Sequence, residues 1–213
     1  RIHFISIGNF RHEPNWNAVQ LLNKSIWPLI RRRLPQAELH LYGSYATDKV
    51  IQLHDIKSGF IITGRAISVE DVFSKGKVSL APLQFGAGLK GKVLDAMKNG
   101  TPCAMNNIAS EGMFGNNLPN GIIEDDVNLF IEKAANLYKN KTLWTNFQNN
   151  GIQALNARFN TTAFATLFIR HVAHLQKHIN DHLASPILLE QILNALLFYR
   201  HAVHRLPFLY SYY

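Results

Sequence analysis

The chain has 213 residues, of which 47% are hydrophobic and 17% are charged. This composition suits one domain, or one domain with an appendage, and no run of 18 apolar residues predicts a membrane span. The single cysteine, Cys103, excludes an intrachain disulfide and a cysteine zinc cluster, and it fits a reducing compartment. We therefore expect a cytoplasmic protein.

The formal net charge of +8 leaves three kinds of anionic partner open: nucleic acid, a membrane surface or a phosphate-bearing substrate. The densest basic run, Arg31 to Arg33, is typical of a helix C-terminus, where cations offset the helix dipole. Aromatic residues do not alternate with basic ones as a base-stacking platform requires, so we expect no nucleic-acid partner. A peripheral contact with the inner face of the membrane stays open.

Short apolar runs alternate with longer amphipathic ones over the first 125 residues. The predicted strands are 3–8, 38–43, 59–64, 77–83, 101–105 and 121–123. The predicted helices between them are 15–33, 46–56, 68–75 and 89–99, with Pro14 just ahead of the first and Ser68 as an N-cap. Because the strands are near-continuous apolar runs, both faces of the sheet should be covered. This pattern predicts an α/β fold with a doubly wound, mainly parallel, Rossmann-like sheet.

From residue 127 onward the pattern becomes helical, with predicted helices 127–139, 142–157, 161–182 and 188–204. We expect two parts: a Rossmann-like domain over residues 1–157 and a helical tail over residues 158–213. His174, His178 and His182 would share one face of a tail helix, a spacing that can bind a metal. A partly exposed polar stripe is the preferred interpretation.

The segment "PLQFGAGLKGKVLDAMKNGTP", residues 82–102, carries the strongest functional signal. Its glycines follow a predicted strand, where ligands of parallel sheets bind and where glycine lets the backbone approach them closely. A helix beginning near Leu89 would offer N–H groups to a phosphate, and Lys90 and Lys92 would add charge. Asp95, in the same helix, can accept hydrogen bonds from sugar hydroxyls. The pattern predicts a site for a phosphorylated sugar or nucleotide, and the alternative is a glycine-rich turn with solvated lysines.

This segment resembles the donor site of the retaining glycosyltransferases of family 4, the group 1 enzymes built from two Rossmann-like domains (the GT-B fold). The family motif has two spaced acids, the second within Leu-Glu-Ala-Met, followed by Gly-x-Pro. The second half is matched by Leu94-Asp95-Ala96-Met97 and Gly100-Thr101-Pro102. Further matches are Ser6-Ile-Gly8, His12-Glu-Pro-Asn15, Ile26-Trp-Pro28, Leu34-Pro35, Leu41-Tyr-Gly43, Leu80-Ala-Pro82, Gly86-Ala-Gly-Leu-Lys90 and Ser110-Glu-Gly112. The resemblance covers about residues 3 to 150 and corresponds to the second, donor-binding domain. It implies that the acceptor-binding N-terminal domain is absent and would be a partner.

The resemblance also implies roles for individual residues. Asp95 matches the acid that binds the nucleotide ribose, whereas Ala87 stands where the acid that contacts the sugar is usual. The basic pair expected after the first strand is replaced by Asn9 and Asn15, which leaves Arg11 and Lys90 for the diphosphate. The implied donor-binding residues are Gly8, Asn9, Arg11, Arg65, Gly86, Ala87, Gly88, Leu89, Lys90 and Asp95. Replacement of Gly88 is expected to be more damaging than loss of Lys92, which is interpreted as solvated.

The resemblance implies a hexosyltransferase that takes a nucleotide-diphosphate sugar and glycosylates a glycan or lipid-linked sugar in polysaccharide biosynthesis. This chain alone is expected to be inactive. A sugar-nucleotide epimerase of the same fold and a non-catalytic nucleotide- or partner-binding module remain as alternatives. No metal or cofactor is expected, because helix N–H groups and lysines can neutralise a diphosphate. The sequence does not identify the catalytic residues. His12 and Glu13 form either an acid/base-like pair or a loop cap. Glu111 either faces the ligand or caps a short helix that it opens.

Overall fold

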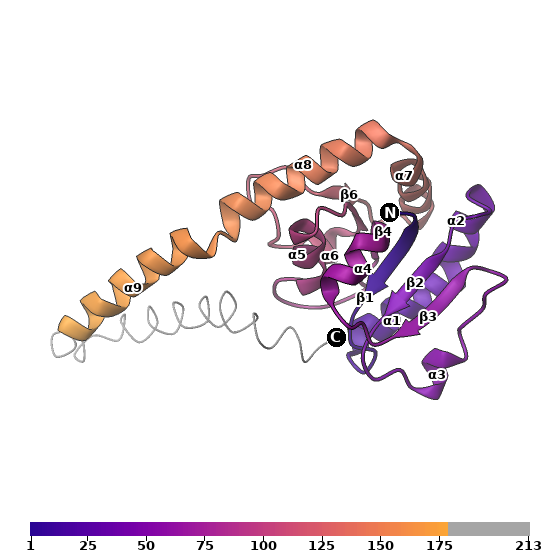
Figure 1. The fold of residues 1–213 in the computed structure, drawn as a ribbon, viewed down its shortest axis with the longest axis horizontal. Coiled ribbons are helices and arrows are strands. Elements are labelled where there is room, and N and C mark those ends of the chain that lie inside the picture. The colour runs from indigo at the N-terminus through magenta and orange to yellow at the C-terminus, as the bar shows by residue number, and fades with distance from the viewer. Residues whose placement is uncertain (179–213) are drawn as a thin grey trace. The chain divides into compact units, whose positions relative to one another are not determined.

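The computed structural model describes residues 1–178 and divides the chain into two compact units (Figure 1). The first unit holds Arg1–Leu155 and contains the whole sheet, and the second begins at Asn156. The expected division into domains after residue 157 stays a prediction. The predicted helix 188–204 and the end of the predicted helix 161–182 lie outside the described residues.

Within residues 1–178, six strands form one parallel sheet in the order β3-β2-β1-β4-β5-β6. They are β1 (His3–Ile7), β2 (Leu39–Tyr42), β3 (Phe60–Gly64), β4 (Gly76–Ala81), β5 (Cys103–Met105) and β6 (Gly121–Ile123). The prediction of a doubly wound parallel α/β sheet is confirmed. Strand order reverses between β1 and β4, so the chain leaves these neighbours toward opposite faces and opens a crevice at their carboxyl ends.

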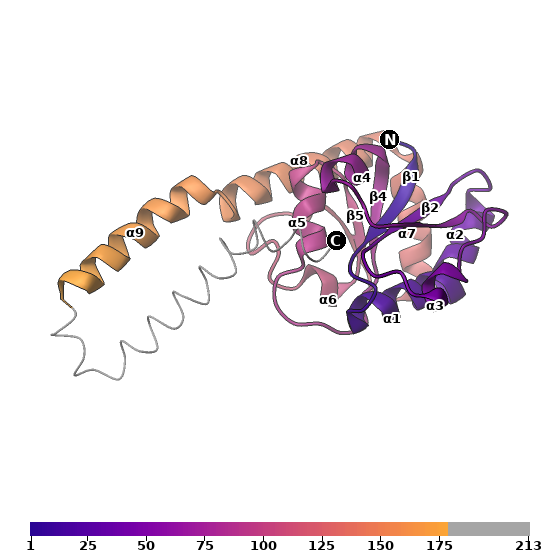
Figure 2. The ribbon, with the colours of Figure 1, turned by 60° about the horizontal axis from the view of Figure 1, so that its bottom comes forward.

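Helices cover the two faces of the sheet (Figures 1 and 2). On one face lie α1 (Glu13–Leu21), the π-helical segment η1 (Leu22–Ile26), α2 (Trp27–Arg33) and α7 (Val127–Lys139). On the other lie α4 (Val69–Lys75) and α5 (Gly91–Lys98). Phe4 of β1 is fully buried on the first face, where its ring stacks on Tyr138 at 4.7 Å and meets the edge of Trp27 at 5.8 Å. Aromatic pairs of this kind contribute stability beyond that of the area they bury. They therefore hold α2 and α7 against the sheet.

The predicted helix 15–33 is interrupted by the wider turns of η1. Pro28, in the first turn of α2, has no backbone N–H, and its ring excludes a normal helical bond to the carbonyl four residues earlier. The π-helical segment directly before α2 accommodates this loss. Pro14 lies inside the first turn of α1 rather than ahead of it, a position where a missing N–H costs nothing.

Three other sequence-based boundaries differ from the structure. The predicted helix 46–56 is shorter in the structure, where α3 spans Asp48–Ile51. The chain turns at Asp55, whose side chain accepts the N–H of Lys57 at 2.9 Å and whose backbone forms a β-bridge with Phe60. The predicted helix 89–99 begins at Gly91. Glu111 does not open a short helix but follows α6 (Asn107–Ser110).

The remaining helices agree closely with the sequence. Ser68 caps α4 as expected, since its Oγ accepts the N–H of Asp71 at 3.0 Å. The helix predicted over 127–139 is α7, and the last two described helices are α8 (Lys141–Arg158) and α9 (Thr161–Lys177). Within residues 1–178, no helix combines the length and apolar character needed to cross a membrane.

Candidate functional site

Two loops border the crevice at the carboxyl ends of β1 and β4. Residues 8–12 connect β1 to α1, and residues 82–90 connect β4 to α5. Because this is the switch point of the sheet, both loops end in helices that diverge and leave room for a ligand between them. Nine of the ten predicted donor-binding residues lie on these two loops or on α5. The exception, Arg65, is exposed after β3.

The β1 loop is held by two asparagines, Asn9 within the loop and Asn15 in the first turn of α1. Asn15 Nδ2 donates to the carbonyl of Asn9 at 3.1 Å, and Asn9 Oδ1 accepts the N–H of Arg11 at 2.8 Å. A side chain at Gly8 would place its Cβ only 2.6 Å from Asn15 Nδ2, so glycine is required for Asn15 to pack here. The guanidinium of Arg11 lies over the ring of Tyr45 at 4.4 Å.

The β4 loop owes its shape to two glycines with positive φ, 144° at Gly86 and 71° at Gly88. Lys90 closes the loop: its Nζ donates to the carbonyl of Gly88 at 2.6 Å and lies 3.4 Å from that of Gly86. Glu111 lies 3.8 Å from the same ammonium, and Lys90 is only 8% exposed. The ammonium therefore braces its own loop, and its expected contact with a diphosphate stays a prediction.

Lys92, in the first turn of α5, contacts the first turn of α1. Its Nζ donates to Asn15 Oδ1 at 2.8 Å, although the two residues are 77 positions apart. Both side chains line a small pocket whose walls are Ser6, Ile7, Gly8, Phe10, Asn15, Val19, Leu41, Tyr42 and Lys92. The residue as a whole is partly exposed, but burial of its amino group lowers the pKa of Lys92 to about 8. The expectation of a solvated Lys92 is therefore wrong.

This finding also removes the reason for ranking Gly88 above Lys92. A Cβ on Gly88 would meet no atom of the described residues within 4 Å, so a substitution there disturbs the backbone conformation and not the packing. Sequence reasoning left Lys92 out of the donor-binding set. One signal was available, because Lys92 and Asp95 are three positions apart and share a side of α5.

The other predicted residues take distinct positions. Asp95 is 5% exposed on α5, beyond the residues that line the pocket, and Ala87 and Gly88 are exposed on the loop. Lys90 occupies the N-cap position of α5 without capping it, so its side chain leaves the first-turn N–H groups uncovered. His12 occupies the N-cap position of α1, in agreement with the loop-capping interpretation, but its side chain makes no cap hydrogen bond.

The described strands thus form an open parallel sheet with glycine turns and a lysine at its switch point. Residues 1–140 match the family described as "Glycosyl transferases group 1", and the chain belongs to this family. No match was found among curated proteins.

Several solved structures share the fold. A mutant of S. aureus TarM, in complex with fondaparinux, alpha-GlcNAc-glycerol and UDP, is 15% identical with a TM-score of 0.66 over 80% of this chain and 36% of its own. Sucrose-phosphate synthase from Thermosynechococcus elongatus is 16% identical, with a TM-score of 0.62 over 82% of this chain and 46% of its own. The catalytic domain of Helicobacter pylori cholesterol-alpha-glucosyltransferase is 14% identical, with a TM-score of 0.53 over 73% of this chain and 99% of its own. This chain thus spans less than half the length of the first two.

Proposed function

We propose that this chain is the donor-binding half of a retaining glycosyltransferase and that its crevice binds a nucleoside-diphosphate sugar. The observation that carries the proposal is the lysine at the switch point whose amino group is buried, where Lys92 Nζ meets Asn15 Oδ1 at 2.8 Å. The family's usual basic pair after β1 is replaced by two asparagines here. Lys92 supplies a cation to the same crevice from α5.

Chemically, the crevice suits the leaving group of a glycosyl transfer. A nucleoside diphosphate gains negative charge as the bond to the sugar breaks, and preorganised donors stabilise that charge. The N-terminus of α5 and the Lys92 ammonium supply two such donors from one helix. The exposed backbone of residues 86–88 is the part of the loop that would approach the sugar. Such a set requires no metal at the donor site.

The proposal is tested by calorimetric titration of the purified 213-residue chain with uridine and guanosine diphosphates. UDP is the first choice because the TarM structure contains it. We expect binding of one diphosphate. We also expect no acceptor-dependent release of nucleotide from sugar donors, because alignment of donor and acceptor supplies about 7–11 kcal/mol of the barrier reduction and half a cleft forfeits most of it. Absence of diphosphate binding would refute the proposal.

The same assays separate the alternative functions. Epimerisation of the sugar nucleotide without an acceptor would identify an epimerase. Binding without any turnover, by this chain and by a protein that also carries an acceptor domain, would identify a binding module. Acceptor-dependent turnover by the present chain at about 1 per second, an ordinary enzyme rate, would show that no further domain is needed.

Asp95→Asn is expected to weaken nucleotide-sugar binding by roughly tenfold to a hundredfold, because a hydrogen bond to a charged group contributes about 1.5–3 kcal/mol. Asparagine is preferred to alanine because Asp95 is buried and the amide preserves its shape. Calorimetry should show this loss for a complete nucleotide, whereas inorganic pyrophosphate, which has no ribose, should bind both proteins equally. Equal loss for both ligands would remove Asp95 from the ribose site.

A further inference from the structure

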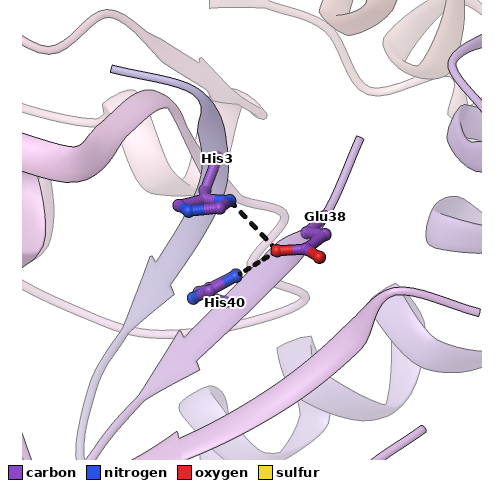
Figure 3. Close-up of side chains that lie close together, drawn as sticks. All are labelled: His3, Glu38 and His40. Carbon is purple, nitrogen blue, oxygen red and sulfur yellow. Dashed lines mark hydrogen bonds and ion pairs between the residues drawn. The ribbon is translucent and has the colours of Figure 1, made fainter. Parts of the chain in front are cut away.

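Two histidines and a glutamate meet at the amino ends of β1 and β2 (Figure 3). His3 Nδ1 lies 3.3 Å from Glu38 Oε2, and His40 Nε2 lies 2.8 Å from the same oxygen. The two imidazole rings are stacked, with centroids 3.9 Å apart and planes inclined by 24°. The strand register explains the meeting: His40 pairs with Ile5, and His3 lies two residues before Ile5 on the same side of β1.

The His3–Glu38 distance of 3.3 Å equals the spacing of ligand atoms around a metal ion, and the His40–Glu38 distance of 2.8 Å is shorter. A tetrahedral zinc ion with bonds of about 2.0–2.1 Å separates its ligand atoms by about 3.3 Å. The two nitrogens and the carboxylate oxygen lie within 4.8 Å of one another, and an ion placed among them would replace the contacts that Glu38 Oε2 makes with the two rings. Two imidazoles and one carboxylate also form a donor set that zinc uses, with a further position open to water.

The exposure of the three side chains fits a site that an ion can enter. The histidine side chains are 19% and 18% exposed, whereas that of Glu38 is 43% exposed. Stacking restrains the rings while the carboxylate lies open to solvent on the side of the sheet away from Phe4. The chain thus offers two ordered nitrogen ligands and an accessible oxygen ligand.

We propose that His3, Glu38 and His40 form a binding site for Zn²⁺ that joins β1 to β2. The site is separate from the donor crevice, because the crevice opens at the carboxyl ends of the strands and the cluster lies at their amino ends. Its role is to hold the two strands together, and the proposal does not depend on the proposed transferase function.

The test is zinc binding to the chain prepared without a histidine tag, measured by calorimetry and by the visible spectrum of Co²⁺ in its place. Loss of an outer-shell partner already costs about 10–100-fold in metal affinity, so His40→Gln should weaken this site about 100-fold or more. His3→Gln and Glu38→Gln should behave alike. Bound zinc at 100 times its dissociation constant should raise the melting temperature by about 5–11 °C.

The matched control is His174→Gln with His178→Gln, because these two rings lie 4.7 Å apart at the end of α9 and form the competing candidate. The control variant should keep the proposed site. If it loses the zinc while His40→Gln retains it, or if the wild-type chain binds no zinc below millimolar concentration, the proposal is wrong. Should the variants misfold, zinc must still shift the imidazole NMR signals of His3 and His40 in the wild-type chain and leave those of His54 in place.

Discussion

Replacing Lys92 with methionine is expected to weaken UDP binding by about tenfold to a hundredfold while raising the stability of the domain at pH 7. Affinity falls because the variant loses a charge-assisted contact with the diphosphate, worth about 1.5–3 kcal/mol. Stability rises because methionine has no charge to bury where the pKa of Lys92 is lowered to about 8. A residue that costs stability and improves binding is characteristic of a functional site.

The stability gain can be estimated and has a defined pH dependence. A pKa of about 8 against the ordinary 10.5 corresponds to at most about 3 kcal/mol, and loss of the hydrogen bond to Asn15 offsets about 1 kcal/mol. Below pH 8 both the folded and the unfolded chain hold the proton, so the full cost of the buried charge is present. Between pH 8 and pH 10.5 only the unfolded chain holds it. The free energy of unfolding of the wild type therefore rises with pH relative to the variant.

Chemical denaturation of both proteins at pH 7 and at pH 10 measures this difference, which should be about 2 kcal/mol at pH 7 and smaller at pH 10. UDP affinity supplies the second readout. In the wild type it should fall as the pH rises through 8, where the free protein loses the proton, and the variant should lack this step. The control is Lys98→Met, which removes an exposed lysine of the same helix and should change neither property. If Lys98→Met lowers UDP affinity as much as Lys92→Met does, only net charge matters and the crevice lysine has no special role.

Gly43→Ala is expected to destabilise the domain by about 3 kcal/mol or more, the range of severe packing changes. Gly43 follows β2 and contacts the β1 loop so closely that an added Cβ would lie 2.1 Å from the carbonyl oxygen of Gly8 and 2.8 Å from the ring of Phe10. The clash is with backbone, which cannot rotate away, so the β1 loop must move. The melting temperature should fall by about 6–12 °C.

Gly64→Ala provides the comparison, because Gly64 ends a neighbouring strand, has a φ of 81°, and has no atom of the described residues within 4 Å of an added Cβ. Its cost should be limited to the left-handed backbone conformation, about 1–2 kcal/mol. Thermal unfolding followed by circular dichroism distinguishes the two variants. Equal melting temperatures would show that the β1 loop tolerates the displacement and that its position is not held tightly.

The elements that the sequence determined are those that depend on neighbours along the chain. Alternating apolar runs predicted all six strands, and Ser68 was recognised as a cap because the donor it satisfies lies three residues away. The glycine turn after β4 was equally local, since positive φ at Gly86 and Gly88 needs no distant partner. Repeated strand–helix units then led to the parallel sheet and its binding edge.

Tertiary structure decided what the polar side chains contact. Lys90 and Lys92 are equivalent in the sequence, yet one ammonium braces its own loop and the other reaches Asn15 from 77 positions away. The cluster of His3, Glu38 and His40 likewise depends on pairing of β1 with β2, which no local pattern reveals. Even the helix predicted over 46–56 was cut short by a contact with β3. Hydrophobic periodicity is a local property, whereas a buried charge is stabilised only by whichever polar group the fold brings to it.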